Sequence, residues 1–281
     1  MENIRTNLSS SLSGISDRLK SAWFRARGRR PFTMGYRAYK EEEVRRVLLR
    51  GEFRPDQLPR GYGVDLDERI IEYPWLLTSL PEGPGAVLDA GSALNFRSWL
   101  DHPRLASKKI YICTLAPERH SYWELGVSYT FQDLRQTCFR DTFFDYVVCL
   151  STLEHVGLDN GRFYTGQPTL ERRAESYVDA VREMARILRP GGTLYLTMPF
   201  GRYADLGWLQ VFDGRMIDRV IETFRASRTK EQIFRYTEEG WQVSNRREAE
   251  DSRYVDLHSQ PGWRQGTPVA AEAVACLLLT R

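Results

Sequence analysis

Two side chains that can exchange protons, Glu154 and His155, stand shortly after an apolar run over residues 145–150, DYVVCL. A continuous apolar run of this kind is typical of a central parallel strand that is buried on both faces. In open α/β sheets, ligands bind at the edge where such strands end. His155 is the best candidate for a general base, because an imidazole titrates near neutral pH, and Glu154 is the second candidate catalytic residue. The alternative is that His155 only shapes the wall of a pocket.

A second stretch, residues 86–95 (AVLDAGSALN), has the residue types of a ligand-binding turn. Its apolar residues predict a buried strand, and the Pro/Gly run over 81–85 separates that strand from a preceding helix. Asp89 stands at the carboxyl end of the strand. After Gly91, backbone N–H groups can approach a ligand closely, because glycine has no Cβ. The stretch therefore predicts a strand, a ligand-binding turn and the start of a helix.

Together with residues 144–156 (FDYVVCLSTLEHV) and 185–199 (ARILRPGGTLYLTMP), this stretch resembles the class I S-adenosylmethionine-dependent methyltransferases. The resemblance extends over residues 70–199. The first motif of that family usually has three alternating glycines, whereas here only Gly91 is present and Asn95 takes the third position. The resemblance implies a doubly wound α/β fold with a mostly parallel, seven-stranded, Rossmann-like sheet.

The same resemblance implies that the chain binds S-adenosylmethionine. Asp133 would accept a hydrogen bond from the exocyclic amine of adenine, and Leu134 would donate its backbone N–H. Thr114 stands where the family usually has an acid that binds both ribose hydroxyls, and Glu118 is an alternative partner for the ribose, unless it is a solvated loop residue. Asp133 has a structural alternative as the cap of a turn. The candidate cofactor-binding residues are Asp89, Gly91, Ser92, Asn95, Thr114, Asp133, Leu134 and Ser151.

The remaining apolar patterns predict the scaffold around these residues. Further strands are expected over residues 109–115, 128–132, 193–198 and 269–280, the last as an antiparallel edge strand. Helices are expected over residues 40–50, 65–80, 171–188 and 213–224, the first short and charged and the third amphipathic. In the second of these helices, Asp65 and Glu68 suit a capping box and Pro74 predicts a kink or break. Tyr62 and Tyr73 either face the cofactor or pack against the sheet.

The domain organisation follows from these elements. We expect a basic arm over residues 1–40, a methyltransferase-like domain over 41–281, and within that domain an insertion over 200–262 on the acceptor side. Residues 232–236 and 241–243 suit a strand or a hairpin. Candidate acceptor contacts in the insertion are Tyr203, Asp205, Trp208 and Asp213. In the loop before it, Asp159 and Asn160 are two oxygen ligands without a third, and no metal site is expected.

The arm has a distinctive charge and apolar pattern. Residues 1–40 have nine Lys/Arg and two Asp/Glu, whereas the rest of the chain has 31 and 35. Because the basic character is confined to the arm, a nucleic-acid-binding catalytic domain is not expected. Within residues 1–30, an apolar stripe at helical spacing either lies on an anionic membrane or docks to a partner, or it packs on the protein itself. The stripe consists of Ile4, Leu8, Leu12, Ile15, Leu19 and Trp23.

These observations favour an enzyme that methylates an oxygen of a small molecule or a glycan, with a saccharide hydroxyl as the acceptor. The four cysteines have no CxxC spacing, which favours a reducing compartment, and we expect a cytoplasmic protein that is free or peripheral at the inner face of the membrane. The alternative is a non-catalytic binding or scaffold protein with a degenerate donor site. A nucleotide-binding oxidoreductase is disfavoured, because its fingerprint needs more glycines and an acid after the second strand.

Overall fold

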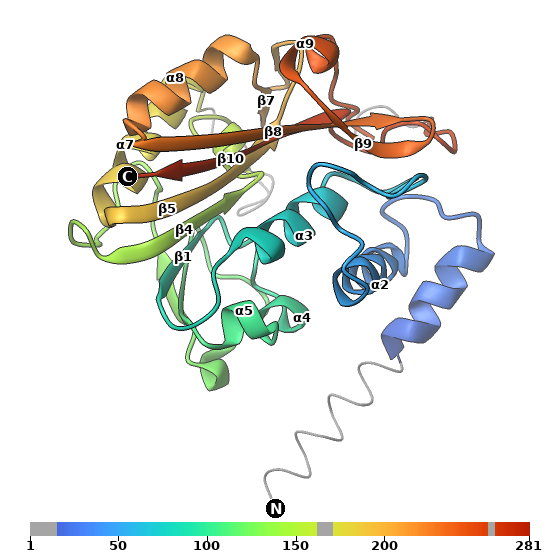
Figure 1. Cartoon of the computed structure of the whole chain (residues 1–281), viewed down its shortest axis with the longest axis horizontal. Coiled ribbons are helices and arrows are strands. Elements are labelled where there is room, and N and C mark those ends of the chain that lie inside the picture. Colours follow the sequence, from blue (N-terminus) through green and yellow to red (C-terminus); the bar gives the residue numbers. More distant parts are fainter. Residues whose placement is uncertain (1–15, 162–170, 258–261) are drawn as a thin grey trace, which may run out of the picture. The chain divides into compact units, whose positions relative to one another are not determined.

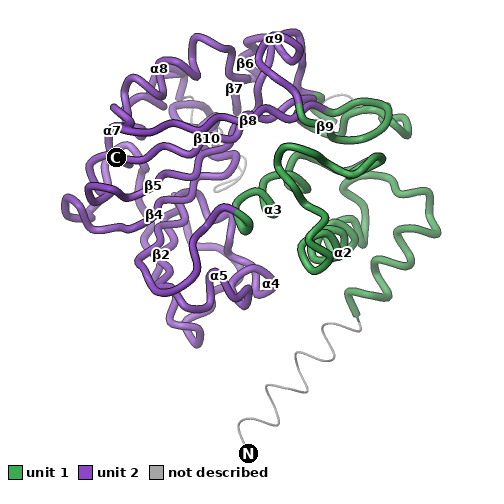
Figure 2. Tube along the Cα trace, in the orientation of Figure 1, with its two compact units in different colours: residues 1–78, 236–243, 255–270 green, residues 79–235, 244–254, 271–281 purple. Residues whose placement is uncertain are grey.

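The computed structural model describes residues 16–161, 171–257 and 262–281, and the chain divides into two compact units (Figure 2). The first unit comprises residues 1–78, 236–243 and 255–270, and the second comprises residues 79–235, 244–254 and 271–281. All three stretches that resemble the methyltransferase family lie in the second unit. The described residues include no helix that is long and apolar enough to cross a membrane.

A mostly parallel sheet has the strand order β3-β2-β1-β4-β5-β10-β8-β9 (Figure 1), and its strands other than β9 lie wholly or mainly in the second unit. The four pairs among β1 to β5 are parallel, and β10 runs antiparallel between β5 and β8. The strands are β1 Ala86–Ala90, β2 Lys109–Thr114, β3 Ser128–Phe131, β4 Phe144–Leu150, β5 Leu188–Pro199, β8 Arg228–Thr237, β9 Gly240–Ser244 and β10 Ala273–Thr280. This confirms the doubly wound α/β class.

The sheet has eight strands among the described residues, one more than the seven predicted. The additional strand is β9, which follows β8 after a tight turn in a stretch that suits either a strand or a hairpin. Two short strands, β6 Ala204–Asp205 and β7 Gln210–Val211, form a separate antiparallel pair within the insertion. The insertion therefore supplies structure of its own, as its length requires.

Helices α7 Tyr177–Ile187 and α8 Gly214–Phe224 pack against each other and against the sheet. Their apolar faces share one core with the strands; Val181, Met184, Ile217, Val220, Leu196 and Leu277 belong to it. The remaining helical segments of this unit are α4 Arg97–Leu100, α5 Pro103–Ala106, α9 Arg246–Ala249 and the 3₁₀ helices η1 Trp123–Leu125, η2 Leu153–His155 and η3 Ala174–Ser176. The short η2 turn places Glu154 and His155 immediately after β4.

The first unit contains a helix over residues 16–26, α2 Tyr36–Leu49 and most of α3 Arg69–Ser79. The prediction that Asp65 caps α3 was wrong, because the helix begins at Arg69 and the Asp67 carboxylate accepts from the Arg69 N–H at 3.1 Å. The Asp65 carboxylate instead accepts from the Gly266 N–H at 2.8 Å.

Pro74 lies inside α3, and the secondary structure continues through it. Proline has no N–H to donate to the carbonyl four residues earlier, which is that of Ile70. The Tyr62 hydroxyl donates to this carbonyl at 2.6 Å and satisfies it. Tyr62 is therefore a buried packing residue of the first unit, which is the second of the two roles expected for it.

The described part of the arm presents the end of its apolar stripe to solvent. Leu19 is 67% exposed and Trp23 is 37% exposed, whereas Phe24 is buried. The other members of the stripe, from Ile4 to Ile15, lie outside the described residues. The helix over residues 16–26 packs on the first unit through Phe24, which contacts Tyr36 and Tyr39, while Leu19 and part of Trp23 remain exposed.

Candidate active site

The turn after β1 is held by the strand's own acid. The buried Asp89 carboxylate accepts hydrogen bonds from the Ala93 N–H at 3.1 Å and from the Leu94 N–H at 2.8 Å. The acid and its two donors are four and five residues apart, so this segment shapes its own loop. Asp89 therefore fixes the backbone of the donor motif, and its oxygens point at that backbone.

Gly91 is required by a close approach between two loops. Its φ is +111°, and a Cβ at this position would overlap the side chain of Thr152, which follows β4. The Gly91 N–H donates to the carbonyl oxygen of Cys113 on β2 at 2.9 Å. The one glycine that remains of the family's motif is thus the one at which the β1 and β4 loops meet.

Two hydroxyls near this loop are buried without a hydrogen-bond partner in the described chain. They are Ser92 Oγ, in a residue with a φ of +66°, and Thr114 Oγ1, at the end of β2. A buried hydroxyl without a partner costs free energy, on the order of 1–3 kcal/mol. Both groups lie at the carboxyl edge of the sheet, where a polar ligand could satisfy them.

Asn95, which replaces the third glycine, ties three loops together. Its Nδ2 donates to Glu118 Oε2 at 2.8 Å and to the His120 carbonyl at 3.1 Å, while its Oδ1 accepts from the Tyr129 hydroxyl at 2.9 Å. Its amide is therefore engaged by the protein. The same bond brings the Glu118 carboxylate beside the donor motif, although Glu118 is exposed and far from Asn95 in sequence.

Asp133 is engaged by a neighbouring arginine. Arg135 donates its backbone N–H to Asp133 Oδ1 at 2.8 Å and its Nε to both carboxylate oxygens, and its Nη1 also pairs with Glu171. Burial would raise the pKa of Asp133, but the hydrogen bonds and charge of Arg135 outweigh it and lower the pKa. The carboxylate is therefore ionised, and its Oδ2 also accepts from Arg135 Nη2 at 2.5 Å. The neighbouring Leu134 side chain belongs to the buried core.

The turn after β4 is also tightly constrained. Ser151 has a φ of +36°, and its N–H donates to the carbonyl oxygen and to Oγ1 of Thr197 at 3.1 and 3.0 Å. This contact with β5 directs the chain into η2, where Glu154 is buried. His155 Nε2 lies 4.0 Å from Glu154 Oε1, so the two candidate catalytic residues are neighbours in space as well as in sequence.

The imidazole of His155 is oriented by the insertion. Its Nδ1 lies 2.8 Å from the carbonyl oxygen of Trp208, and its ring stacks on the Trp208 indole with centroids 5.3 Å apart. Because a carbonyl only accepts, Nδ1 is the protonated nitrogen in the neutral ring and Nε2 has the basic lone pair. Tyr254 packs edge-on against Trp208 at 6.0 Å. His155, Trp208 and Tyr254 thus form an aromatic cluster after β4.

The other candidate acceptor contacts have different environments. Asp213 caps α8, with its Oδ1 accepting from the Met216 N–H at 2.9 Å, and Asp205 accepts from the Gly207 N–H at 2.7 Å within its own turn. Tyr203 is exposed and lines an open cavity of about 570 Å³ with Asp213. Asp159 accepts from the Gly161 N–H, and no group of three potential metal ligands occurs in residues 16–161, 171–257 and 262–281.

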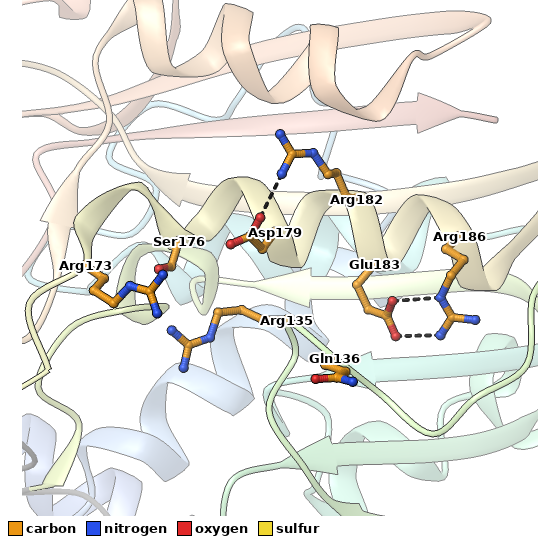
Figure 3. Close-up of a pocket in the computed structure, with 8 residues that line it drawn as sticks. All are labelled: Arg135, Gln136, Arg173, Ser176, Asp179, Arg182, Glu183 and Arg186. Atoms are coloured by element: carbon orange, nitrogen blue, oxygen red, sulfur yellow. Dashed lines mark hydrogen bonds and ion pairs between the residues drawn. The ribbon is translucent and has the colours of Figure 1, made fainter.

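Figure 3 shows a second open cavity, of about 450 Å³, beside α7. It is lined by four arginines, two acids and two neutral polar residues: Arg135, Arg173, Arg182, Arg186, Asp179, Glu183, Gln136 and Ser176. Asp179 pairs with Arg182, and Glu183 pairs with Arg186, as the dashed lines indicate. Three of the four arginines are thus neutralised by acids, so this surface is a network of ion pairs.

Sequence reasoning missed three contributors to the site: Thr152, the Trp208 carbonyl and Tyr254. No sequence signal marks Thr152. Only the contact between the β1 and β4 loops shows that its side chain faces Gly91. Tyr254 lies about 100 residues after His155 and has no local pattern that marks it. A backbone carbonyl has no sequence signal at all.

Part of the chain matches a known protein family. Residues 104–196 match the family described as a methyltransferase domain. The match includes Thr114, Asp133, Leu134, Ser151, Glu154 and His155, and it begins after the glycine-poor turn. The matched segment lies in the second unit, whose mostly parallel sheet has the Rossmann-like architecture of a class I methyltransferase fold. No curated protein sequence matches the chain.

Several solved structures are similar in fold. The N-methyltransferase NodS from Bradyrhizobium japonicum is 16% identical, with 76% of this chain and 96% of that chain covered and a TM-score of 0.44. A methyltransferase from Methanosarcina mazei is 12% identical, with 73% and 96% covered and a TM-score of 0.44. A chain of the complex between the Haloferax volcanii Trm112 methyltransferase activator and a putative methyltransferase is 13% identical, with 74% and 88% covered and a TM-score of 0.45.

Proposed function

We propose that the chain transfers a methyl group from S-adenosylmethionine to a hydroxyl oxygen of a small molecule, with a saccharide as the favoured acceptor. The observation that carries the oxygen preference is the orientation of His155 by the Trp208 carbonyl at 2.8 Å. With the proton on Nδ1, the basic lone pair of the neutral ring is on Nε2. Methylation of a hydroxyl needs such a base, because the proton must leave as the new carbon–oxygen bond forms.

The residues at the carboxyl ends of β1 to β3 suit the cofactor. When bound, S-adenosylmethionine supplies an electrophilic methyl group on a sulfonium. The buried hydroxyls of Ser92 and Thr114 need partners, and a ligand with polar groups on a ribose and an amino acid moiety would supply them. Asp133 is ionised, and its partly exposed carboxylate is the proposed acceptor for the adenine amine.

The acid–base step uses two residues in different roles. His155 Nε2 takes the hydroxyl proton, and the imidazolium then donates from Nδ1 to the Trp208 carbonyl. The buried Glu154 carboxylate, 4.0 Å from Nε2, stabilises the positive charge that develops on the ring. Most of the rate enhancement comes from holding the acceptor oxygen in line with the methyl group.

The aromatic cluster of His155, Trp208 and Tyr254 supports a saccharide acceptor. The exposed ring of Tyr203 adds a further aromatic surface in the insertion. Aromatic faces offer an apolar surface, and tyrosine and tryptophan also have a polar group that can hydrogen-bond. We further propose that the enzyme works in the cytoplasm, where the exposed Leu19 and Trp23 with the basic arm bring it to an anionic membrane or a partner.

Calorimetric titration with S-adenosylhomocysteine tests the donor site. We expect micromolar binding by the full chain, weaker by about threefold to tenfold in Thr114→Val, which removes one hydrogen bond of about 0.5–1.5 kcal/mol. Thr229→Val, on the exposed part of β8, is the matched control and should bind as the wild type does. Asp133→Ala should weaken binding further.

An absence of binding by folded protein up to millimolar ligand would contradict the proposal and favour a scaffold protein. If the donor binds, a screen of hydroxyl and amine acceptors with labelled S-adenosylmethionine tests the acceptor. Methylation of amines alone would refute the oxygen preference.

For the arm, Leu19→Ser/Trp23→Ser should reduce sedimentation with anionic vesicles, and unchanged sedimentation would argue against the membrane role.

A further inference from the structure

The first unit has a small, partly open cavity of about 170 Å³ that the proposed methyl transfer does not use. It lies among the end of the arm, α2 and the loop over residues 59–64. Its lining includes Arg29, Tyr39, Glu43, Arg46 and Arg60. Cavities that enclose a whole drug-sized ligand measure about 300–1,000 Å³, so this one has room only for a small chemical group.

Arg29 is a charge without a counterion in this cavity. Its side chain is partly buried, its Nη2 donates to the Val64 carbonyl at 3.0 Å, and its Nε is buried without a hydrogen-bond partner. No carboxylate of the described residues lies within 4.0 Å of its guanidinium. A buried charge is costly unless it is paired and hydrogen-bonded, and therefore this guanidinium favours an anion in the cavity.

The other charges of the lining are already compensated. Arg46 pairs with Glu43 at 2.8 Å and with Glu52 at 3.2 Å, and the exposed Arg60 pairs with Glu239 at 2.7 Å. The Glu43 carboxylate is therefore neutralised by Arg46 and is not the missing partner of Arg29. The net excess of positive charge in the cavity belongs to Arg29.

Tyr39 supplies a second donor. Its ring lies under the Arg29 guanidinium, with the Cζ atom 5.2 Å from the ring centroid. Tyr39 is buried, and its hydroxyl has no hydrogen-bond partner among the described residues. Burial raises the pKa of Tyr39, although the charge of Arg29 opposes it. The hydroxyl therefore keeps its proton at neutral pH and can donate it in a hydrogen bond.

We propose that this cavity is an oxyanion-binding site, in which Arg29 and Tyr39 bind the phosphoryl group of a ligand whose remainder lies outside. Arginine suits phosphate oxygens because its planar guanidinium offers several donors in a fixed geometry. Both a free phosphorylated compound and the headgroup of an anionic lipid present this group. The site is independent of the donor site and would hold even if the chain did not transfer methyl groups.

Inorganic phosphate is the first probe. Titrated into the full chain at constant ionic strength with sodium chloride, it should raise the melting temperature in a saturable way, as expected for a ligand that binds only the folded state. Arg29→Met should weaken the apparent phosphate affinity at least tenfold, and Tyr39→Phe by about twofold to tenfold, the loss of one hydrogen bond. Arg45→Met, on the exposed face of α2, is the matched control and should leave the affinity unchanged.

An unsaturable response, or the same response in all variants, would overturn the proposal. Tyr39→Phe removes only one oxygen and keeps the test valid if Arg29→Met fails to fold, as shown by circular dichroism. Two further probes distinguish a lipid headgroup from a free phosphorylated compound. They are vesicles of phosphatidylcholine with and without phosphatidic acid, and glycerol phosphate in solution. Arg29-dependent binding to either supports the site, and binding to both kinds of vesicle alike would contradict it.

Discussion

The turns after β1 and β4 meet at Gly91 and Thr152, yet they are built in opposite ways. The β1 turn is held by Asp89, which binds backbone N–H groups four and five residues further along the same segment. The imidazole after β4 is held by the Trp208 carbonyl, 53 residues away in the insertion. The acid of the β1 turn therefore acts through local hydrogen bonds, whereas the imidazole after β4 is oriented by a distant segment.

Because of this difference, we expect substitutions in the two turns to have different effects. A local hydrogen bond costs little loop-closure entropy, so the β1 turn keeps its form wherever the strand is in place. The orientation of His155 depends on the insertion over residues 200–262 being folded. We therefore expect changes near β1 to act mainly on stability and cofactor binding, and changes near His155 to act mainly on turnover.

The largest effect is expected for His155→Ala. Loss of a general base lowers the turnover number by about 10²–10⁴-fold. Steady-state kinetics with an identified acceptor would measure it, with S-adenosylhomocysteine affinity unchanged within about twofold, because the residue acts on the acceptor. The control is His120→Ala, whose side chain is exposed. A variant that keeps a third of the wild-type rate would show that His155 only shapes the pocket.

The next effect concerns the contact of the two turns. Gly91→Ala combines an unfavourable φ with overlap against Thr152, and we expect about 2–5 kcal/mol lower unfolding free energy. Gly83→Ala is the matched control: it has a φ of +85° but open space at the Cβ position, and it should lose only about 1 kcal/mol. Urea unfolding measures both. Equal losses would mean that the close approach does not constrain the turns.

Asp89→Asn tests the hydrogen bonds that the Asp89 carboxylate accepts from backbone N–H groups of its own turn. The two side chains have nearly the same shape. One carboxylate oxygen becomes an amide nitrogen that faces a backbone N–H, and we expect a loss of about 1–3 kcal/mol in unfolding free energy. Asp101→Asn, in an exposed ion pair with Arg97, should change it by less than about 1 kcal/mol. If the two substitutions cost the same, the β1 turn does not depend on Asp89.

Trp208→Phe should have a smaller effect on the acceptor side. The backbone carbonyl that binds His155 is kept, and only part of a ring contact worth about 0.5–1.5 kcal/mol is lost. We expect a twofold to tenfold fall in kcat/KM, with Trp123→Phe as an exposed control. A loss as large as that of His155→Ala would mean that the indole itself positions the base or the acceptor.

The smallest effect is expected for the pair of Asp133 and Arg135. The pKa of Asp133 is lowered in the folded state, so its contribution to stability is present above the unfolded pKa of about 3.9 and disappears as the pH falls through the folded pKa. The pair is partly exposed, so the contribution is less than about 1 kcal/mol. Arg135→Met should flatten the stability curve below pH 4 in urea titrations, and an unchanged curve would contradict this assignment.

Much of the sheet could be predicted from short-range patterns, and the errors have physical reasons. The apolar runs of β1, β2, β4 and β5 give their positions, because strands buried on both faces need such runs. The sequence leaves open the choice between a strand and a hairpin at β8 and β9, and it predicts a kink or break at Pro74, where α3 is continuous. Both depend on distant partners: β9 on β8, and the Ile70 carbonyl on the Tyr62 hydroxyl.

The residues of the candidate site also fall into two groups, those whose roles depend on near neighbours in sequence and those whose roles depend on distant residues. The roles of Asp205 and Asp213 as caps of their own turns can be understood from the residues that follow each of them. The role of Asn95 cannot, because the amide acquires its function only when the loops that contain Glu118, His120 and Tyr129 are brought beside it.

The sequence by itself determined the positions of the buried strands β1, β2, β4 and β5, the glycine turn after β1, and the presence of an imidazole after β4. These depend on apolar periodicity and on hydrogen bonds between near neighbours in the chain. Only the tertiary structure decided which nitrogen of His155 is basic, which side chains surround it, and that Arg29 lacks a counterion. Those properties depend on groups far apart in sequence, and a side chain's charge and proton positions respond to whichever groups packing brings within hydrogen-bonding distance.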